Sequence, residues 1–280
     1  MEPITTMKTV PSRWSTYSVL VMAALLSVGS VRAQVLYSQT FDYTTASSGS
    51  ASLFGWNAYA GSSAIDLSTS KTTTTAIDVN SNATAGYSTK IFNGLGSPHG
   101  TQGYLAFDYD SNTGSGYALD VAAVKTGLSL SNVSTITWQS SRTGTFATLP
   151  TTRLLVQVGG VWYASETTFT SATASTGSTL DDRMASADSF SLSAASATTW
   201  RVLTLTPGSQ LSLASTTTTL DLASSLVTGV GFYGELASRY TSINYDTLVV
   251  SAVPEPASVV LLGLGLGGLA LSRRRLLRGL

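Results

Sequence analysis

Residues 153–164 read Arg-Leu-Leu-Val-Gln-Val-Gly-Gly-Val-Trp-Tyr-Ala, and this stretch decides the fold class. Two runs rich in valine, leucine and aromatic residues flank the pair Gly159-Gly160. Two glycines between such runs are typical of a tight two-residue hairpin turn, because the turn needs backbone angles that glycine adopts freely. The stretch therefore predicts an antiparallel hairpin with Val158 beside Val161.

Similar short segments recur along the chain from Gln34 to Val253. In Thr135-Ile136-Thr137-Trp138-Gln139-Ser140, Ile136 and Trp138 share one face, which is the period-2 alternation of a half-buried strand. No window of about 12 residues has a helical stripe, and the best helical candidate, 180–187, is short. We expect strands at 35–41, 103–109, 117–121, 135–141, 153–158, 161–164, 200–205, 229–233 and 242–250.

Many short strands with turn signals between them favour an all-β fold, an antiparallel β-sandwich of the jelly-roll type. A single domain is expected over residues 34–252, because no linker interrupts the pattern. Tracts rich in serine and threonine are expected to form loops or edge strands, at 68–75, 170–179 and 215–219.

The composition fits an exported protein. The 280 residues include no cysteine, so the fold has no disulfide, which fits a bacterial exported domain whose own core supplies the stability. Residues 34–253 carry 8 Lys/Arg and 13 Asp/Glu, a net charge of −5. A mildly acidic body lacks the basic stripe that a nucleic-acid backbone requires, which argues against nucleic-acid binding.

The two ends of this body resemble lectin-like jelly rolls of bacterial exported proteins. The opening residues 35–42, with Gly55-Trp56, are similar to the first strands of such domains, and 230–233 and 243–250 are similar to the closing strands. The resemblance implies a concanavalin-A/LamG-like or galactose-binding-like sandwich. It also implies that the first and last strands pair and bring the ends of the domain together.

The amino terminus has the parts of a secretory signal peptide. Lys8 and Arg13 precede an apolar segment at 17–28, and Val31-Arg32-Ala33 is a small-x-small cleavage site. We expect export through the Sec translocon and removal of residues 1–33, with cleavage between Ala33 and Gln34. The alternative is an uncleaved membrane anchor.

The carboxyl terminus, residues 253–280, has three parts in order: Pro254-Glu255-Pro256, an apolar glycine-rich run, and an arginine cluster. As a helix, 257–272 would span about 24 Å, which is short of the roughly 30 Å hydrocarbon core. By the positive-inside rule the arginines should stay in the cytoplasm, namely Arg273, Arg274, Arg275 and Arg278.

This arrangement resembles the PEP-CTERM sorting tail. The resemblance implies that an exosortase, a membrane protease-transpeptidase, recognises Pro254, Glu255 and Pro256. It also implies a transient inner-membrane anchor through a short transmembrane helix, followed by delivery to the cell surface or extracellular matrix. Members of this family are exported by bacteria that make extracellular polysaccharide.

Catalytic motifs are weak in the body. His99 is its only histidine and lies in a turn-forming context, so a Ser-His-Asp triad is not expected. Glu166 and Glu235 are its only glutamates and are far apart in sequence. We expect no enzymatic activity, and a polysaccharide-active enzyme that uses aspartates, for which Asp181-Asp182 is a weak candidate, is the least favoured alternative.

Asp108-x-Asp110-x-Asn112 is the best metal-like cluster. Alternating oxygen ligands begin a calcium loop, but Thr113 stands where glycine is expected and Leu119 where glutamate is expected. A turn with side-chain to backbone hydrogen bonds explains the same residues. Calcium is thus a weak hypothesis, and no other cofactor is expected.

Two aromatic pairs are candidates for stacking on sugar rings: Trp56 with Tyr59, and Trp162 with Tyr163. The alternative is that they fill the core between two sheets, as we expect for Trp138 and Trp200. The favoured function is accordingly a non-enzymatic exported surface or matrix protein. The alternative is a carbohydrate-binding module that acts on extracellular polysaccharide.

Overall fold

The computed structural model describes residues 33–41, 49–50, 55–61, 76–78, 87–93, 103–109, 119–143, 149–171, 174–175, 184, 187–194, 197–236 and 241–252. Its strands belong to a unit that spans Gln34–Val253. They are β1 Val35–Gln39, β2 Gly49–Ser50, β3 Trp56–Gly61, β4 Ala76–Asp78, β5 Tyr87–Asn93, β6 Gly103–Tyr109, β7 Leu119–Leu130, β8 Val133–Thr143, β9 Thr151–Val158, β10 Val161–Ser165, β11 Ala174–Ser175, β12 Asp188–Ser193, β13 Thr198–Thr206, β14 Gln210–Leu220, β15 Val227–Leu236 and β16 Thr241–Ala252.

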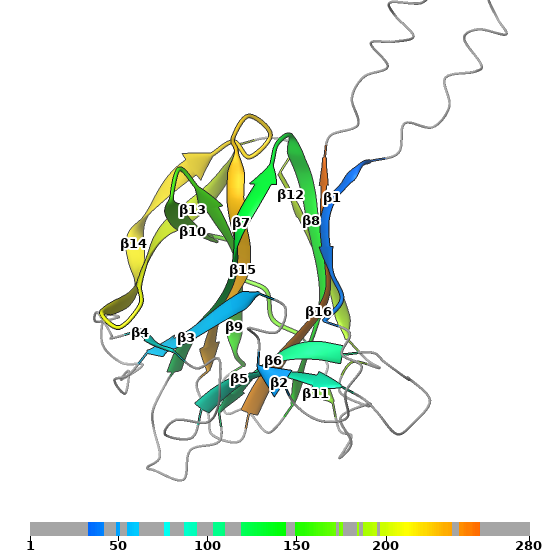
Figure 1. Ribbon diagram of the computed structural model, residues 1–280, viewed down its shortest axis with the longest axis vertical. Helices are drawn as coiled ribbons and strands as arrows, with labels where there is room; N and C mark the ends of the chain where they lie inside the picture. Colours follow the sequence, from blue (N-terminus) through cyan, green and yellow to red (C-terminus); the bar gives the residue numbers. More distant parts are fainter. Residues whose placement is uncertain are drawn as a thin grey trace, which may run out of the picture. The chain divides into compact units, whose positions relative to one another are not determined.

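The strands form two sheets, so the expected all-β antiparallel sandwich is confirmed (Figure 1). Sheet B runs in the order β14-β13-β10-β9-β15-β7-β3-β4. Sheet A is centred on β16, which pairs with β8 on one side and with β6 and β1 on the other. β12 and β11 extend sheet A beyond β8, and β5 and β2 extend it beyond β6. Among the described pairs only β11 with β8 is parallel.

The predicted hairpin forms as expected. β9 and β10 are antiparallel, and Val158 pairs with Val161. Gly159 and Gly160 have φ angles of 59° and 80°, the left-handed values that a type I′ turn requires at both central residues. The nine expected strands all coincide with observed strands, but β7 continues to Leu130, well past the predicted end at Val121. The tract 215–219 lies in β14, an edge strand of sheet B.

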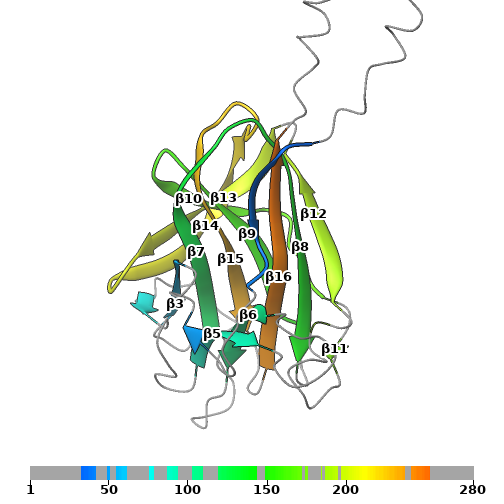
Figure 2. The same ribbon diagram turned by 45° about the vertical axis from the view of Figure 1, so that its right-hand side comes forward.

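The first and last strands pair, as the resemblance implied. Val35 lies opposite Ser251, and Gln39 lies opposite Leu248. The N–H of Ala252 donates a hydrogen bond of 2.8 Å to the carbonyl oxygen of Gln34. Figure 2 shows β12, β8, β16 and β1 side by side in this part of sheet A. The two ends of the strand-bearing unit therefore leave from the same end of sheet A.

An aromatic core fills the space between the sheets. Phe232 of β15 stacks on Tyr245 of β16, with ring centroids 4.2 Å apart and planes at 9°. The indoles of Trp56 and Trp138 lie 6.1 Å and 6.0 Å from the same phenyl ring. The Tyr245 hydroxyl and Thr152 Oγ1 share a buried hydrogen bond of 3.1 Å across the sheets. Phe232 is thus at the centre of the contact between the layers.

Sheet B also has a second apolar face, directed away from sheet A. Its buried residues form a separate cluster, which we call the outer cluster: Ala122, Val124, Leu155, Trp162, Ala164, Leu203, Leu211 and Tyr233. β14, at one edge of the sheet, comes back to approach β3 near the other edge. The sheet therefore curls around the outer cluster and buries its second face within itself.

Within the described residues no helix is long and apolar enough to span a bilayer. The short helix expected at 257–272 lies outside the described residues, as do most of 180–187 and all of the signal peptide except Ala33.

We expect Phe232→Ala to lower the free energy of unfolding by about 3–5 kcal/mol, because it removes the ring that contacts three other aromatic side chains in a fully buried site. Phe232→Leu, which keeps most of the volume, should cost clearly less. Urea unfolding of the purified protein measures both, and equal midpoints for wild type and Phe232→Ala would contradict the central role of Phe232.

Candidate functional site

Charged side chains gather at one end of the outer face of sheet B. We call Asp120, Arg153, Glu166, Arg201, Tyr233 and Glu235 the charged cluster. Each comes from a different strand or strand end, except that Tyr233 and Glu235 share β15. The register places Tyr233 opposite Arg153 and Glu235 opposite Asp120. Alternate residues of a strand face the same side, so these side chains share the face that carries the outer cluster.

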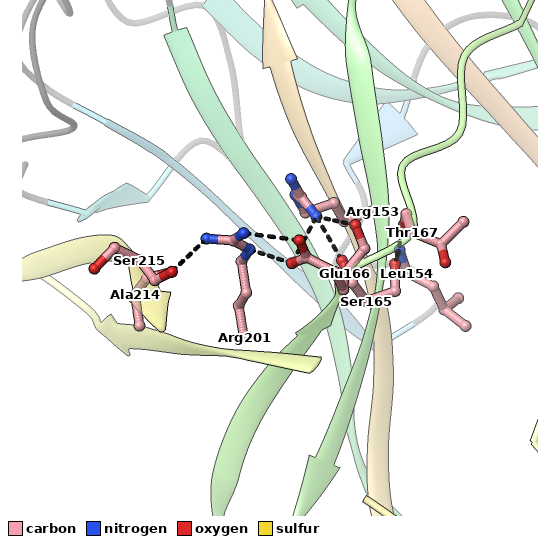
Figure 3. A network of polar contacts seen from close by, with 8 residues as sticks. All are labelled: Arg153, Leu154, Ser165, Glu166, Thr167, Arg201, Ala214 and Ser215. Carbon is pink, nitrogen blue, oxygen red and sulfur yellow. Dashed lines mark hydrogen bonds and ion pairs between the residues drawn. The ribbon is translucent and has the colours of Figure 1, made fainter. Parts of the chain in front are cut away.

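Arg201 and Glu166 form the best-defined contact of the cluster (Figure 3). Arg201 Nε donates to Glu166 Oε2, and Nη2 donates to Oε1 at 2.8 Å, so the guanidinium grips both carboxylate oxygens. Arg201 Nη1 donates to the carbonyl oxygens of Ser215 at 2.8 Å and Ala214 at 3.3 Å. Paired bonds of this kind fix orientation as well as charge. Arg201 therefore joins β13 to the end of β10 and to β14.

Arg153 binds the backbone of residues 165–166, where β10 ends. Its Nη1 donates to the carbonyl oxygens of Ser165 and Glu166, both at 2.7 Å, and lies 3.9 Å from Glu166 Oε2. Ser165 Oγ accepts a hydrogen bond from Leu154 N–H at 3.1 Å and donates to the carbonyl oxygen of Thr167 at 2.7 Å. The chain after β10 is thereby held on the sheet, with the Glu166 carboxylate between two guanidinium groups.

The charges of the cluster shift the pKa values of Glu166, Arg201 and Tyr233. The hydrogen bond from Arg201 holds the pKa of Glu166 below its ordinary value, against the opposing effect of burial. The pKa of Arg201 is raised by the same bond and by the charges of Glu166 and Glu235. Burial raises the pKa of Tyr233 well above its ordinary value, and the negative charges of Asp120 and Glu235 act in the same direction. The phenol therefore stays neutral and the ion pair stays charged near neutral pH.

Tyr59 of β3 is an aromatic residue on the strand that neighbours Asp120 of β7. It lies opposite Ala122 of β7, on the face that carries Asp120, and it is half-buried against the outer cluster. A partly exposed ring on the same face as carboxylate and guanidinium groups combines a stacking surface with fixed hydrogen-bonding groups. Such a combination suits a polar ligand with an apolar side, which is the chemistry of a sugar ring.

The other aromatic candidates lie elsewhere. Trp56 is fully buried between the sheets, at 0% exposure, with Phe41 and Phe232 against its ring. Trp162 is 7% exposed, and its ring reaches across β9 to β15, where a Cβ added to Gly229 would lie 2.7 Å from Trp162 Cη2. Neither indole offers a free face for stacking, so Trp56 and Trp162 are core residues rather than stacking surfaces. Trp138 and Trp200 lie in the core, as expected.

Residue spacing explains why the two members of each aromatic pair do not lie on the same face of the sheet. Neighbouring positions on a strand face opposite sides, so Tyr163 lies on the inner face and packs on the core between the sheets, while Trp162 faces outward. Trp56 and Tyr59, three positions apart, are likewise divided between the two faces. Of the four candidates, Tyr59 alone is both partly exposed and on the face of the charged cluster.

Several expected site residues cannot be placed. Asp108 lies in β6 opposite Ser242, and its side chain is outside the described part of the structure. Outside the described residues altogether are Asp110, Asn112, His99, Pro254, Glu255, Pro256, Arg273, Arg274, Arg275 and Arg278. The side chains that the structure describes include no group of three or more His, Asp or Glu that could hold a metal ion.

The charged cluster was not predicted as a site. Glu166 and Glu235 looked unrelated because 68 residues separate them in the sequence, yet sheet B brings them to one face. One signal was present: the register of the predicted hairpin, continued past Ala164 and Leu155, places Glu166 opposite Arg153. The contribution of Glu235 and Asp120 depends on pairing between distant strands, which no local pattern shows.

Comparisons with known proteins add information on the tail. Residues 252–275 match the PEP-CTERM protein-sorting motif. The chain is therefore an exported protein that is sorted through its carboxyl terminus. No curated protein matches the sequence.

Solved structures with a similar fold are distant. The family 11 carbohydrate-binding module of a cellulosomal cellulase of Clostridium thermocellum is 12% identical, with a TM-score of 0.37 over 82% of this chain and 99% of the module. The cleaved adhesin domain of Lys-gingipain from Porphyromonas gingivalis is 15% identical, with a TM-score of 0.33 over 78% and 98%. Scores this low carry no inference about what this chain binds.

The contribution of Glu166 to stability should depend on pH. Because its pKa is lowered in the folded protein, the ion pair stabilises the fold above the ordinary glutamate pKa of 4.5, and this stabilisation is lost as the pH falls through the lowered value. We expect Glu166→Gln to unfold at lower urea concentration than wild type at pH 7, with a smaller difference at pH 3. The exposed substitution Thr217→Ser is the control, and a difference that does not change with pH would refute the ion-pair explanation.

Proposed function

We propose that this chain is a non-enzymatic surface or matrix protein whose β-sandwich body is delivered outside the cell by the sorting tail. The observation that carries the proposal is the match of residues 252–275 to the sorting motif. In this proposal residues 34–252 are the body, an exosortase recognises Pro254, Glu255 and Pro256, and the apolar segment that follows is a temporary membrane anchor held by Arg273, Arg274, Arg275 and Arg278.

The amino-terminal end is part of the same proposal. Removal of residues 1–33 by cleavage after Ala33 would leave Gln34 as the first residue, one position before β1. The pairing of β1 with β16 supports this boundary, since Gln34 is already bound to Ala252 at the end of the sheet. Cell surface or extracellular matrix is the destination that the proposal assigns.

Two features support a role without catalysis. The carboxylate of Glu166 is gripped by Arg201 and its pKa is lowered, so it stays ionised and is poorly suited to donate a proton as a general acid. Both faces of the central part of sheet B are packed with the protein's own side chains. A rigid body of this kind is suited to displaying a surface rather than to turning over a substrate.

Processing of the tail can be measured directly. In its native host we expect the mature protein to lack the arginine cluster, and we expect the same chain to keep it in a strain without exosortase. A chain with Glu255→Ala should also keep the tail, because the central residue of the recognised motif is changed. Intact-mass measurement of the purified protein decides this: an intact tail in the exosortase-competent strain would remove the processing step from the proposal.

The charged cluster supports a second candidate function, binding of extracellular polysaccharide. The observation that favours it is the partly exposed ring of Tyr59, on the strand next to Asp120 and on the face that also carries Arg153, Glu166 and Glu235. Ring stacking would supply contact area, and the fixed carboxylate and guanidinium groups would bond sugar hydroxyls. No part of this function requires a metal or cofactor.

We expect Tyr59→Ala to weaken retention of the protein on polysaccharide purified from the matrix of its own host, by about 2- to 10-fold for the loss of one aromatic contact. Tyr163→Ala is the matched control, because it removes the same side chain from the opposite face of sheet B. Thermal unfolding of both variants shows whether the fold is intact. Equal retention of the two variants, or none for wild type, would exclude polysaccharide binding at this cluster.

A further inference from the structure

The outer edge of β14 is the long open edge of sheet B. Within the described strands, β14 pairs only with β13. Its first half is covered, since Leu211 and Leu213 pack on the outer cluster with Tyr59 of β3. Its second half is different: Ser215 and the four threonines that follow are exposed, although they alternate between the two faces of the strand. Nothing described in the structure covers this part of the strand on either face.

A bulge in β14 determines where its regular, unpaired edge begins. β14 is in register with β13 from Thr217 to Leu220, and the register shifts between Thr217 and Leu213. Arg201 binds the carbonyl oxygens of Ala214 and Ser215 in this shifted part. After Leu220 the chain turns away, because the Asp221 side chain accepts hydrogen bonds from Ala223 N–H and Ser224 Oγ. The regular part of the edge is therefore 217–220, and Thr216 joins it to the bulge.

This edge lacks most features that prevent strands from pairing with other chains. Edge strands are usually protected by lysine, other charges, proline or a cover. β14 contains no charged residue and no proline, and its exposed run is threonine, which favours strands. The bulge is the single protective feature in the strand, and it lies before the regular segment.

We propose that 216–220 pairs with the same segment of a second copy of this chain, antiparallel and centred on Thr218. In this register Thr218 faces Thr218, Thr217 faces Thr219, and Thr216 faces Leu220. Threonine pairs across strands are favourable, and no like charges meet. The segment is thus its own complement, and every copy of the chain carries it. This inference does not depend on sugar binding by the charged cluster.

An interface of five residues from each copy is small. It falls below the size of stable protein–protein interfaces, so the association is weak between free molecules. It becomes effective where copies are held close together, because a high local concentration replaces affinity. A protein that a sorting tail delivers to one surface meets that condition. The pairing joins two bodies edge to edge into a dimer, because a self-complementary contact closes on itself.

The absence of cysteine from the chain allows a direct test. Facing residues of antiparallel strands have Cα atoms about 4.5–5.5 Å apart, within the range of about 4.4–6.8 Å that a disulfide accepts. We expect Thr218→Cys, in the full chain expressed in its native host, to give a cross-linked dimer when the cells are treated with a copper–phenanthroline oxidant. Non-reducing gel electrophoresis detects the product.

Thr217→Cys and Thr219→Cys are the matched controls. Each alone should give little dimer, because in this register two copies of residue 217, or two of residue 219, are more than 7 Å apart and exceed disulfide reach. Co-expression of the two variants should restore the dimer, since 217 faces 219. The proposal is overturned if Thr218→Cys gives no dimer, if all three single variants cross-link equally through random collision, or if the mixed pair fails to cross-link.

Discussion

Sheet B has to bury two apolar faces, and much of the rest of the structure depends on this constraint. One face packs on sheet A through Phe232, Tyr245 and the surrounding aromatic rings. The other has no sheet against it among the described residues, so the sheet curls until β14 approaches β3 and the outer cluster is enclosed. A flat sheet would expose that face to water at a cost of about 25 cal/mol for each Å² of apolar surface.

The position of the charged cluster follows from the same constraint. Charged groups are costly to bury unless they are paired, so Arg201 and Glu166 form an ion pair at the end of the outer face, where both side chains stay partly exposed. There Arg201 bridges three strands by binding Glu166 and the carbonyl groups of the β14 bulge. The cluster therefore has a structural role even if it binds no ligand, since Arg201 ties β13 to β14 and to the end of β10 beyond the apolar outer cluster.

Local patterns in the sequence predicted the strands well and the tertiary arrangement only in part. The hairpin at Gly159-Gly160 was predictable because the turn chemistry is local, and its register also contained the contact of Arg153 with Glu166. The length of β7 was missed because its second half includes Lys125, Thr126 and Gly127, which do not alternate as a half-buried strand does. Trp56 and Trp162 looked like binding residues because a sequence does not show which sheet will cover a ring, or that Gly229 leaves room for an indole two strands away.

The pairing of β1 with β16 also determines how the body would carry a mechanical load. β16 is held by β8 on one side and by β6 and β1 on the other, through hydrogen bonds that run perpendicular to the strand. A pull directed along β16 would load these bonds in shear, so all of them would resist together. A strand peeled from a sheet edge would instead lose its bonds one after another. The carboxyl end of the body thus leaves from a strand of sheet A that is paired on both sides.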